Sequence, residues 1–207
     1  IRDSLTQLFE AGTYSEFHTQ TDFVDALSND LRRISRDRHF GLKMVDSSNI
    51  TGGRRKHSLS APQMNTIRRQ NFYFKEVELL SGNIGYLRFD RFSNPELASV
   101  AVSSSIHFLE NCDAIIIDLR YNYGGEEEMV KHIASHFFSN STLINTRNFT
   151  RRDSVVESWT DTSLFVKSLG STDLYVLTGG ATASGAEAFT YGLQNHKRAM
   201  VIGERTS

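Results

Sequence analysis

The order of apolar and polar positions predicts a helical start and then alternating strands and helices. Within residues 1–42, apolar residues recur at helical spacing, as at Val24, Leu27 and Leu31, which is typical of an amphipathic helix. Segment 47–70 is rich in Ser, Asn, Gly and basic residues and has few apolar anchors. We interpret this segment as an exposed connection with a short helix, and a basic docking surface is the alternative.

From residue 71 the pattern changes to that of a sheet. Two apolar runs, 72–80 and 84–89, flank Ser81-Gly82-Asn83, which is a turn signal typical of a β-hairpin. The elements predicted after this hairpin are a helix at 94–109, a buried strand at 113–120, a helix from 126, a hairpin or lid made of 142–148 and 153–159, a strand at 174–177, a helix at 186–194 and a strand at 198–203. This alternation predicts an α/β core with a mostly parallel sheet.

The chain therefore divides into two predicted parts. Residues 1–70 form an N-terminal helical region with its basic connection, and residues 71–207 form the α/β core. The sequence begins without an initiator Met or a signal peptide and closes on GERTS, so both ends look cut from a longer protein.

Composition narrows the classes of function. A chain of 207 residues that is 39% hydrophobic can bury a real core. Its 23 basic and 24 acidic residues give a net charge of -1, so nothing in the charge points to nucleic acid as a partner. The one cysteine, Cys112, excludes an intrachain disulfide framework and a multi-cysteine zinc site. No run of about 18 apolar residues is present, which predicts no membrane span.

Two loops of small residues have the same form. YNYGG at 121–125 follows one predicted buried strand, and GGATASG at 179–185 follows another. In an open α/β sheet, the loops at the carboxyl ends of the strands line the ligand crevice. If the two strands are neighbours, we expect the two loops to face each other.

The second loop places a serine between the end of a strand and the start of a helix. Ser184 in this position is suited to act as a nucleophile, and the N–H of Gly185, with that of Gly124 or Gly125, is suited to bind an oxyanion. The alternative is a plain glycine-rich turn, in which Ser184 only caps the helix and the glycines only supply positive φ angles.

A serine hydroxyl needs a base to take its proton. Among the seven histidines, His132 and His136 lie four residues apart on one helix, but no third metal ligand is indicated, so we interpret them as a surface pair. His39 lies in a polar turn before a short strand predicted at 42–45, where its side chain can reach a cleft. Its alternative is an ordinary exposed histidine at a helix C-terminus.

Four motifs in order carry a family resemblance. The segments GYLRF, DAIIIDLRYNYGG, YVLTGGATASGAEAF and RAMVIGERT resemble the tail-specific (C-terminal processing) serine peptidase family. The chain looks closest to the branch of interphotoreceptor retinoid-binding protein and the tricorn protease core. The resemblance covers residues 84–207, and RDRHFGL near the N-terminus is similar more loosely. It implies a crotonase-like (ClpP/crotonase) α/β fold with a small N-terminal helical region.

The resemblance also implies roles for individual residues. It assigns Ser184 as the nucleophile and Glu187 as the glutamate that follows it in the motif, in a supporting role. The oxyanion donors that it implies are the Gly185 amide and the amide of Gly124 or Gly125.

The base is where the branches of the family differ. The branch with a histidine base implies His39 in this sequence. The lysine branch implies a lysine a few residues after the motif at 203–206, and the sequence ends one residue past that motif, so this alternative stays open. Only about 30 residues separate His39 from the predicted hairpin, too few for the PDZ domain that the lysine-base enzymes usually carry. This spacing favours the histidine.

We therefore expect a serine-type peptidase that cleaves peptides or unfolded protein tails through an acyl-enzyme, without a cofactor or metal. The resemblance alone implies an extracytoplasmic location, periplasmic or secreted. The competing hypothesis is a non-catalytic binding module for an apolar ligand, such as a retinoid or fatty acid, or for peptide tails, because one fold supports several functions. An enoyl-CoA-type enzyme is disfavoured, since its oxyanion loops do not place a serine in an A-S-G-A-E context.

Overall fold

The computed structural model describes residues 1–37, 39–42, 44, 60–149, 153–164 and 168–207. The chain forms two compact units, Ile1–Ser58 and Leu59–Ser207. Helix α3 (Ala61–Arg69), which lies in the part predicted as N-terminal, therefore belongs to the second unit. Residues 43 and 45 of the strand predicted at 42–45 lie outside the described ranges, and so does most of the predicted connection.

The described residues of the first unit contain two α-helices. Helix α1 (Arg2–Glu10) is followed by α2 (Gln20–Ser35), as the apolar spacing predicted. Between them, the Tyr14 ring meets the Phe23 ring edge-on with 5.7 Å between centroids, and its hydroxyl donates to the Asp30 carboxylate at 2.9 Å. The loop after α1 is thereby attached to α2.

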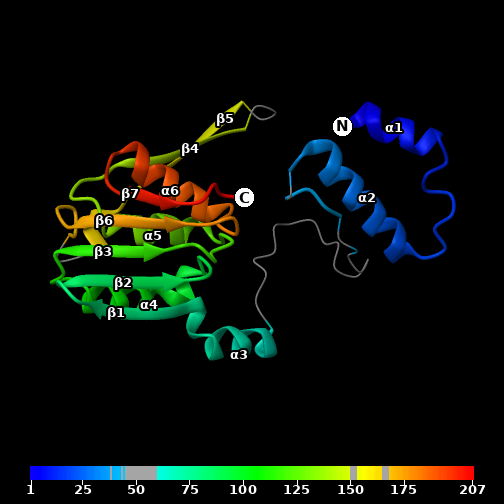
Figure 1. Ribbon diagram of the computed structural model, residues 1–207. Helices are drawn as coiled ribbons and strands as arrows, with labels where there is room; N and C mark the ends of the chain where they lie inside the picture. Colours follow the sequence, from blue (N-terminus) through cyan, green and yellow to red (C-terminus); the bar gives the residue numbers. More distant parts are fainter. Residues whose placement is uncertain (38, 43, 45–59, 150–152, 165–167) are drawn as a thin grey trace. The chain divides into compact units, whose positions relative to one another are not determined.

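The second unit is built on a five-stranded sheet with the order β1-β2-β3-β6-β7 (Figure 1). Strands β1 (Phe74–Leu80) and β2 (Ile84–Phe89) form an antiparallel hairpin. Strands β3 (Ala114–Asp118), β6 (Asp173–Thr178) and β7 (Met200–Gly203) continue the sheet in parallel with β2. The predicted hairpin and the predicted mostly parallel α/β core are confirmed.

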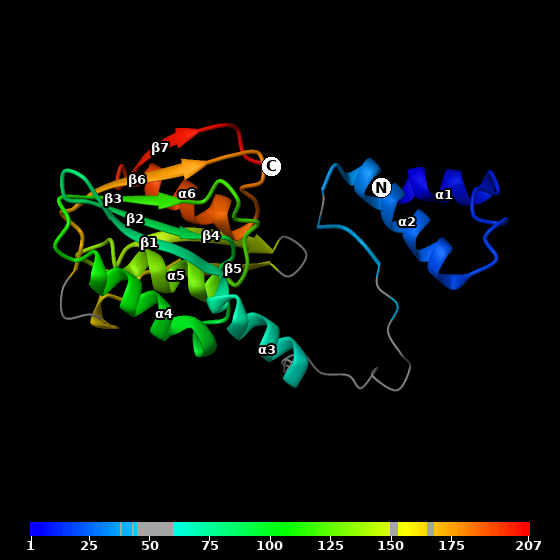
Figure 2. The same cartoon turned by 60° about the horizontal axis from the view of Figure 1, so that its bottom comes forward.

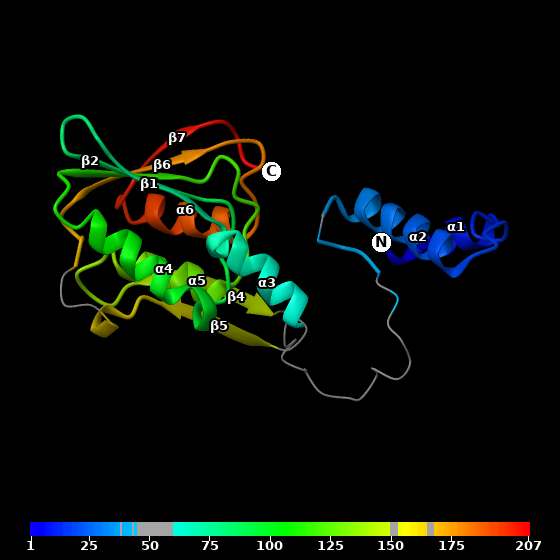
Figure 3. The ribbon, with the colours of Figure 1, turned by 90° about the horizontal axis from the view of Figure 1, so that it is seen from below.

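Three helices lie on the same face of this sheet (Figures 2 and 3). They are α4 (Pro95–Phe108), α5 (Glu127–Ser135) and α6 (Gly185–Asn195). The start of α4 shows why the sequence folds this way: the Asn94 side chain accepts the Glu96 N–H at 2.8 Å, and proline occupies the first turn. Among the helices that the structure describes, none has the length and apolar character needed to cross a membrane.

The core fills the space between the sheet and these helices. Strand β2 alternates half-buried and buried positions, so that Leu87 and Phe89 point inward. The Phe89 ring stacks on Phe74 at 5.2 Å and meets Phe92 edge-on at 4.9 Å. Phe92 in turn contacts Phe189 of α6, with 5.5 Å between the ring centroids. The aromatic cluster thus joins the edge hairpin to the helix that begins at Ser184.

A separate two-stranded antiparallel hairpin lies outside the main sheet. It consists of β4 (Leu143–Phe149) and β5 (Ser154–Trp159), and β4 packs against α6. The predicted hairpin at 142–159 is confirmed. Its position on the helical side of the unit lets it form a wall beside the start of α6.

We expect Phe89→Ala to lower the free energy of unfolding of the second unit by about 3–5 kcal/mol, because it empties a fully buried ring site. Phe108→Ala is the matched control, since that ring is 62% exposed, and its effect should be well below 1 kcal/mol. Urea unfolding followed by the fluorescence of Trp159, the one tryptophan, measures both. Equal losses in the two variants would contradict this account of the core.

Candidate functional site

The two glycine-containing loops leave neighbouring parallel strands. Strands β3 and β6 pair directly, with Asp118 opposite Leu177 at their ends. The Leu119 N–H donates to the Leu177 carbonyl at 2.9 Å, which carries the pairing into the first loop. The expectation that these strands are neighbours is therefore confirmed, and both loops lie at the same edge of the sheet.

A buried carboxylate holds the beginning of the first loop. Asp118 accepts hydrogen bonds from the Arg120 guanidinium at 2.7 Å and from the Tyr86 hydroxyl at 2.7 Å. Burial by itself would raise the pKa of Asp118, but the hydrogen bonds from Arg120 and Tyr86 bring that pKa below its usual value. Burial and the Asp118 carboxylate raise the pKa of Tyr86 to about 12. Asp118 is thus ionised, and it accepts hydrogen bonds from Arg120 and Tyr86.

Asn122 joins three segments of the site. Its side chain is fully buried, donates to the Phe89 carbonyl at 2.8 Å and accepts the Gly124 N–H at 2.8 Å. Its own carbonyl accepts the Ala183 N–H at 3.1 Å. The end of β2, the first loop and the loop before Ser184 are therefore held together by one residue. The sequence analysis missed this role, although an asparagine two residues before a glycine is a known turn signal.

Thr182 makes a second connection between the loops. Its hydroxyl donates to the Leu119 carbonyl at 2.7 Å and accepts the Gly179 N–H at 2.9 Å, and the residue is fully buried. A buried hydroxyl with both hydrogen-bonding functions occupied fixes its loop in one position. This contact could not be predicted from the sequence, because Leu119 lies 63 residues before Thr182 in the chain.

Two positions of the first loop have room only for glycine, because Gly124 faces the second loop and Gly125 faces Phe92, between β2 and α4. Gly124 and Gly125 have φ angles of +91° and +147°. A Cβ atom on Gly124 would lie 2.6 Å from the Ala183 carbonyl oxygen, and one on Gly125 would lie 2.0 Å from the Phe92 carbonyl oxygen. Both the backbone conformation and the space therefore require glycine here.

Two backbone N–H groups beside Ser184 are open for a ligand. Gly185 and Gly125 lie side by side, with the Gly125 nitrogen 3.2 Å from the point where a Cβ on Gly185 would stand. Within the described ranges, neither of their N–H groups makes a hydrogen bond inside the protein. The Gly124 N–H, by contrast, is occupied by Asn122. Two neighbouring N–H groups without a partner among the described residues are candidate donors for an oxyanion.

Ser184 itself sits on a strained turn. It precedes α6 with φ +55° and ψ -116°, a conformation that residues other than glycine rarely adopt. Its N–H donates to the Glu187 carboxylate at 2.6 Å, and the other carboxylate oxygen accepts the Thr206 hydroxyl at 2.9 Å. Glu187 therefore fixes the backbone of Ser184 and also binds the segment after β7. Ser184 and Glu187 are paired as a capping box at the start of α6, which is the helix-capping role that the alternative assigns to Ser184.

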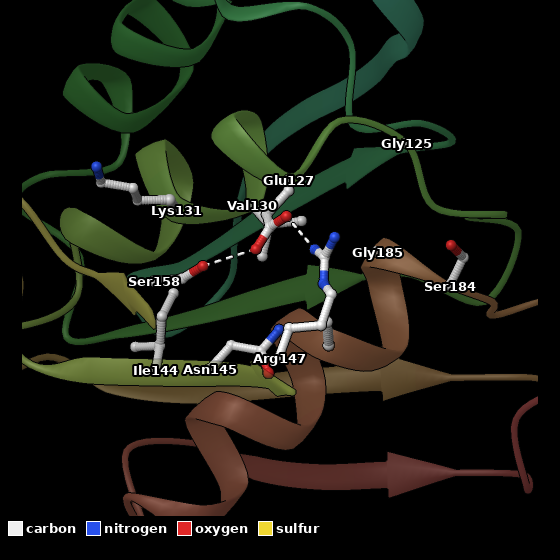
Figure 4. Close-up of a pocket in the computed structure, with 11 residues that line it drawn as sticks. Gly125, Glu127, Val130, Lys131, Ile144, Asn145, Arg147, Ser158, Ser184 and Gly185 are labelled. Atoms are coloured by element: carbon white, nitrogen blue, oxygen red, sulfur yellow. Dashed lines mark hydrogen bonds and ion pairs between the residues drawn. The ribbon is translucent and has the colours of Figure 1, made fainter. Parts of the chain in front are cut away.

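A cavity of about 460 Å³ opens next to Ser184 (Figure 4). It is lined by Gly125, Glu127, Val130, Lys131, Ile144, Asn145, Arg147, Ser158, Ser184, Gly185 and Ala188. These residues come from the loop at 121–125, α5, the β4–β5 hairpin and the start of α6. Ser184, Gly125 and Gly185 therefore border one pocket.

His39 belongs to the first unit. The chain turns at Arg36, with φ +57°, and folds back because the Leu42 N–H donates to Ser28 Oγ at 2.8 Å. The His39 side chain is 70% exposed, and its Nδ1 lies 2.9 Å from the Asp37 carboxylate. Hydrogen bonds from the backbone and side chain of His39 lower the pKa of Asp37. Ser184 lies in the other unit, so the role of His39 as its base stays a prediction.

The second pair of histidines differs from its prediction. His136 is only 4% exposed, so the expected surface pair is wrong for this residue, because the chain turns inward where α5 ends. Burial lowers the pKa of His136 to about 3, with a smaller contribution from the charge of His132, and burial also lowers the pKa of His132. In the part of the chain that the structure describes, no three His, Cys, Asp or Glu side chains gather in a way that would hold a metal.

The comparisons with known proteins agree on one family. The sequence profile of peptidase family S41 matches residues 83–207. A carboxyl-terminal-processing protease of Picosynechococcus sp. is 31% identical over 141 residues, which are 68% of this chain and 33% of that protein. A carboxyl-terminal-processing protease of Synechocystis sp. is 34% identical over 128 residues, which are 60% of this chain and 28% of that protein. The chain belongs to peptidase family S41, which confirms its resemblance to the tail-specific peptidases.

Solved structures show the same fold. A structure described as an S41 protease from Bacteroides fragilis has a TM-score of 0.53 at 21% identity, covering 64% of this chain and 38% of that chain. One described as a peptidase from Parabacteroides merdae has a TM-score of 0.53 at 19% identity, covering 67% and 48%. The chain spans about a third of the length of its curated relatives.

We expect Gly125→Ala to destabilise the second unit by about 3 kcal/mol or more, because the added Cβ overlaps the Phe92 carbonyl. Gly180→Ala is the matched control in the facing loop. A Cβ on Gly180 meets only the Glu204 carboxylate at 3.8 Å, so its effect should stay within about 0.5 kcal/mol. Thermal unfolding of both variants tests this, and a Gly125→Ala protein as stable as Gly180→Ala would show that the first loop does not approach Phe92 as described.

We also expect the second unit to lose stability as the pH falls below 6.5. The pKa of His136 is about 3 in the folded protein and 6.5 in an ordinary environment, so the unfolded chain binds more protons between these values. This residue should cost about 2 kcal/mol at pH 5 relative to pH 7. His136→Gln should remove most of that loss, whereas His107→Gln, at an exposed position, should keep it. Urea unfolding of the wild type and both variants at pH 5 and pH 7 tests whether His136 causes the loss of stability.

Proposed function

We propose that this chain carries the nucleophile and oxyanion site of a serine peptidase that cleaves peptides or unfolded protein tails. The observation that supports this most is the position of Ser184, on a strained turn beside the two open amides of Gly125 and Gly185. We propose further that the fold is crotonase-like, with its parallel strands backed by helices on one face. As in other acyl transfers, no cofactor or metal is required.

In the proposed reaction, a base takes the Ser184 proton and Oγ attacks the scissile carbonyl carbon. The carbonyl oxygen becomes an oxyanion that accepts hydrogen bonds from the N–H groups of Gly125 and Gly185. The Gly124 amide is left out because it already donates to Asn122. Collapse of this intermediate breaks the C–N bond, the base returns its proton to the leaving amine, and water then hydrolyses the acyl-enzyme.

The proposed base is His39. The Asp37 carboxylate beside its Nδ1 is a partner that would hold the ring in one orientation and stabilise its protonated form. The lysine of the alternative branch would follow Thr206. The Ser207 N–H donates to the Thr182 carbonyl at 3.0 Å, so the chain returns to the Ser184 loop at that point. The two candidates predict different variants to be inactive.

Peptide or protein tails are the proposed substrates, because family S41 is a peptidase family and the two relatives compared above are carboxyl-terminal-processing proteases. An apolar ligand in the alternative, non-catalytic function is less suited to the cavity. One wall of that cavity carries Arg147, Glu127 and Lys131. An extracytoplasmic location remains part of this proposal.

We expect a fluorophosphonate probe to label the full chain and Ser184→Ala to abolish the labelling, because the probe bonds to the activated Oγ. Ser105→Ala is the control, since this buried serine only donates to the Ala101 carbonyl of its own helix. His39→Ala should slow labelling by about 100-fold or more. Labelling that persists without Ser184 would refute the nucleophile, and a His39→Ala rate within a few-fold of wild type would place the base elsewhere.

A further inference from the structure

The cavity beside Ser184 has one polar wall whose acceptors are already occupied. Glu127, in the first turn of α5, accepts a hydrogen bond from the Ser158 hydroxyl at 2.7 Å through one carboxylate oxygen. The other carboxylate oxygen accepts from the Arg147 guanidinium. Figure 4 shows both interactions across the cavity, from α5 to the β4–β5 hairpin. Both carboxylate oxygens of Glu127 therefore already accept a hydrogen bond inside the protein.

Donors, in contrast, are in surplus on this wall. A guanidinium carries five N–H groups, and within the described residues only one nitrogen of Arg147, Nη2, is hydrogen-bonded, to Glu127. The Arg147 side chain is 49% exposed, and in Figure 4 its guanidinium lies between Glu127 and the turn that carries Gly185. Lys131 lines the same cavity. With two cations and one carboxylate, the charged lining sums to +1.

Three of the other lining side chains are apolar, and Asn145 is a polar one. Val130 of α5, Ile144 of β4 and Ala188 of α6 face the cavity. A group with an aliphatic stem and an anionic end would therefore contact apolar side chains along its length and meet the free N–H groups of Arg147 at its end. Guanidinium and carboxylate are matched in shape and charge.

We propose that this cavity is a subsite for a carboxylate of the peptide substrate, with Arg147 as the residue that selects it. The inference rests on the proposed function, since Ser184 borders the same cavity. Two groups of a peptide present this chemistry: the side chain of an acidic residue next to the scissile bond, and the α-carboxylate of the last residue of a protein tail. Either carboxylate would accept hydrogen bonds from the Arg147 N–H groups that have no partner among the described residues.

A purely structural role for the Arg147–Glu127 pair makes a different prediction. If the pair only fastens the hairpin to α5, removing either partner has the same effect. If Arg147 binds a substrate carboxylate, Glu127 is its competitor, and the two substitutions act in opposite directions. Arg147→Gln then abolishes selection for the carboxylate, and Glu127→Gln increases it because the guanidinium loses its internal partner.

The experiment compares kcat/KM for two matched peptide pairs on the full chain. One pair carries Glu or Gln before the scissile bond, and the other ends in a free acid or an amide. We expect wild type to prefer the acid about tenfold in one pair, which identifies the source of the carboxylate. Arg147→Gln should reduce the preference to within about twofold, and Glu127→Gln should raise it. Arg33→Gln breaks an exposed pair with Asp30 in the first unit and should keep the wild-type preference.

The same peptides, labelled with a fluorophore, are titrated against Ser184→Ala and followed by anisotropy, which measures binding without turnover. Absence of an acid preference in both pairs, or a preference that survives Arg147→Gln, would overturn the subsite. Equal effects of Arg147→Gln and Glu127→Gln would assign the pair a structural role instead. If wild type neither turns over a peptide nor reacts with the fluorophosphonate, the proposed function fails, and the anisotropy titration still decides the subsite.

Discussion

The site depends on the contact between two loops that leave adjacent parallel strands. Gly124 approaches the backbone from Ala183 to Gly185 so closely that a methyl group on Gly124 would push the two loops apart. Gly125, the next residue, approaches the Phe92 carbonyl just as closely. Asn122 supplies the hydrogen bonds that hold this arrangement. Because the contact is made by backbone atoms in a buried setting, a small displacement of either loop moves every group at the mouth of the cavity.

This contact explains how one strained residue can persist. A serine with a positive φ costs about 1–3 kcal/mol and needs surroundings that hold it. The loop before it is fixed by Thr182 and by the Ala183 N–H, and the helix after it is fixed at Glu187. Support on both sides holds Ser184 in this conformation, and the same contacts keep the amides of Gly125 and Gly185 next to each other.

The sequence could predict the parts of the structure that depend on local patterns. Apolar runs and turn signals indicated the hairpin, the parallel strands and both loops, and the small residues around Ser184 indicated the turn before α6. What depends on distant partners was out of reach. Asn122 acts through Phe89 and Ala183, and Arg147 reaches the cavity because the β4–β5 hairpin packs on α6. His136 was misjudged because helical periodicity does not show that the chain turns inward after residue 135.

The geometry also divides the proposed machinery between the two units. Among the described residues, the hydrogen bonds made by Glu187, Asn122 and Thr182 that hold Ser184 and its neighbouring loops lie within Leu59–Ser207, the unit that carries the proposed nucleophile and oxyanion donors. The base is different. His39 comes from the first unit with its own carboxylate partner, and a base after Thr206 would come from the segment that Glu187 binds. In the proposed mechanism, the serine stays weakly nucleophilic until His39 or a lysine after Thr206 takes its proton, because an unassisted hydroxyl barely ionises.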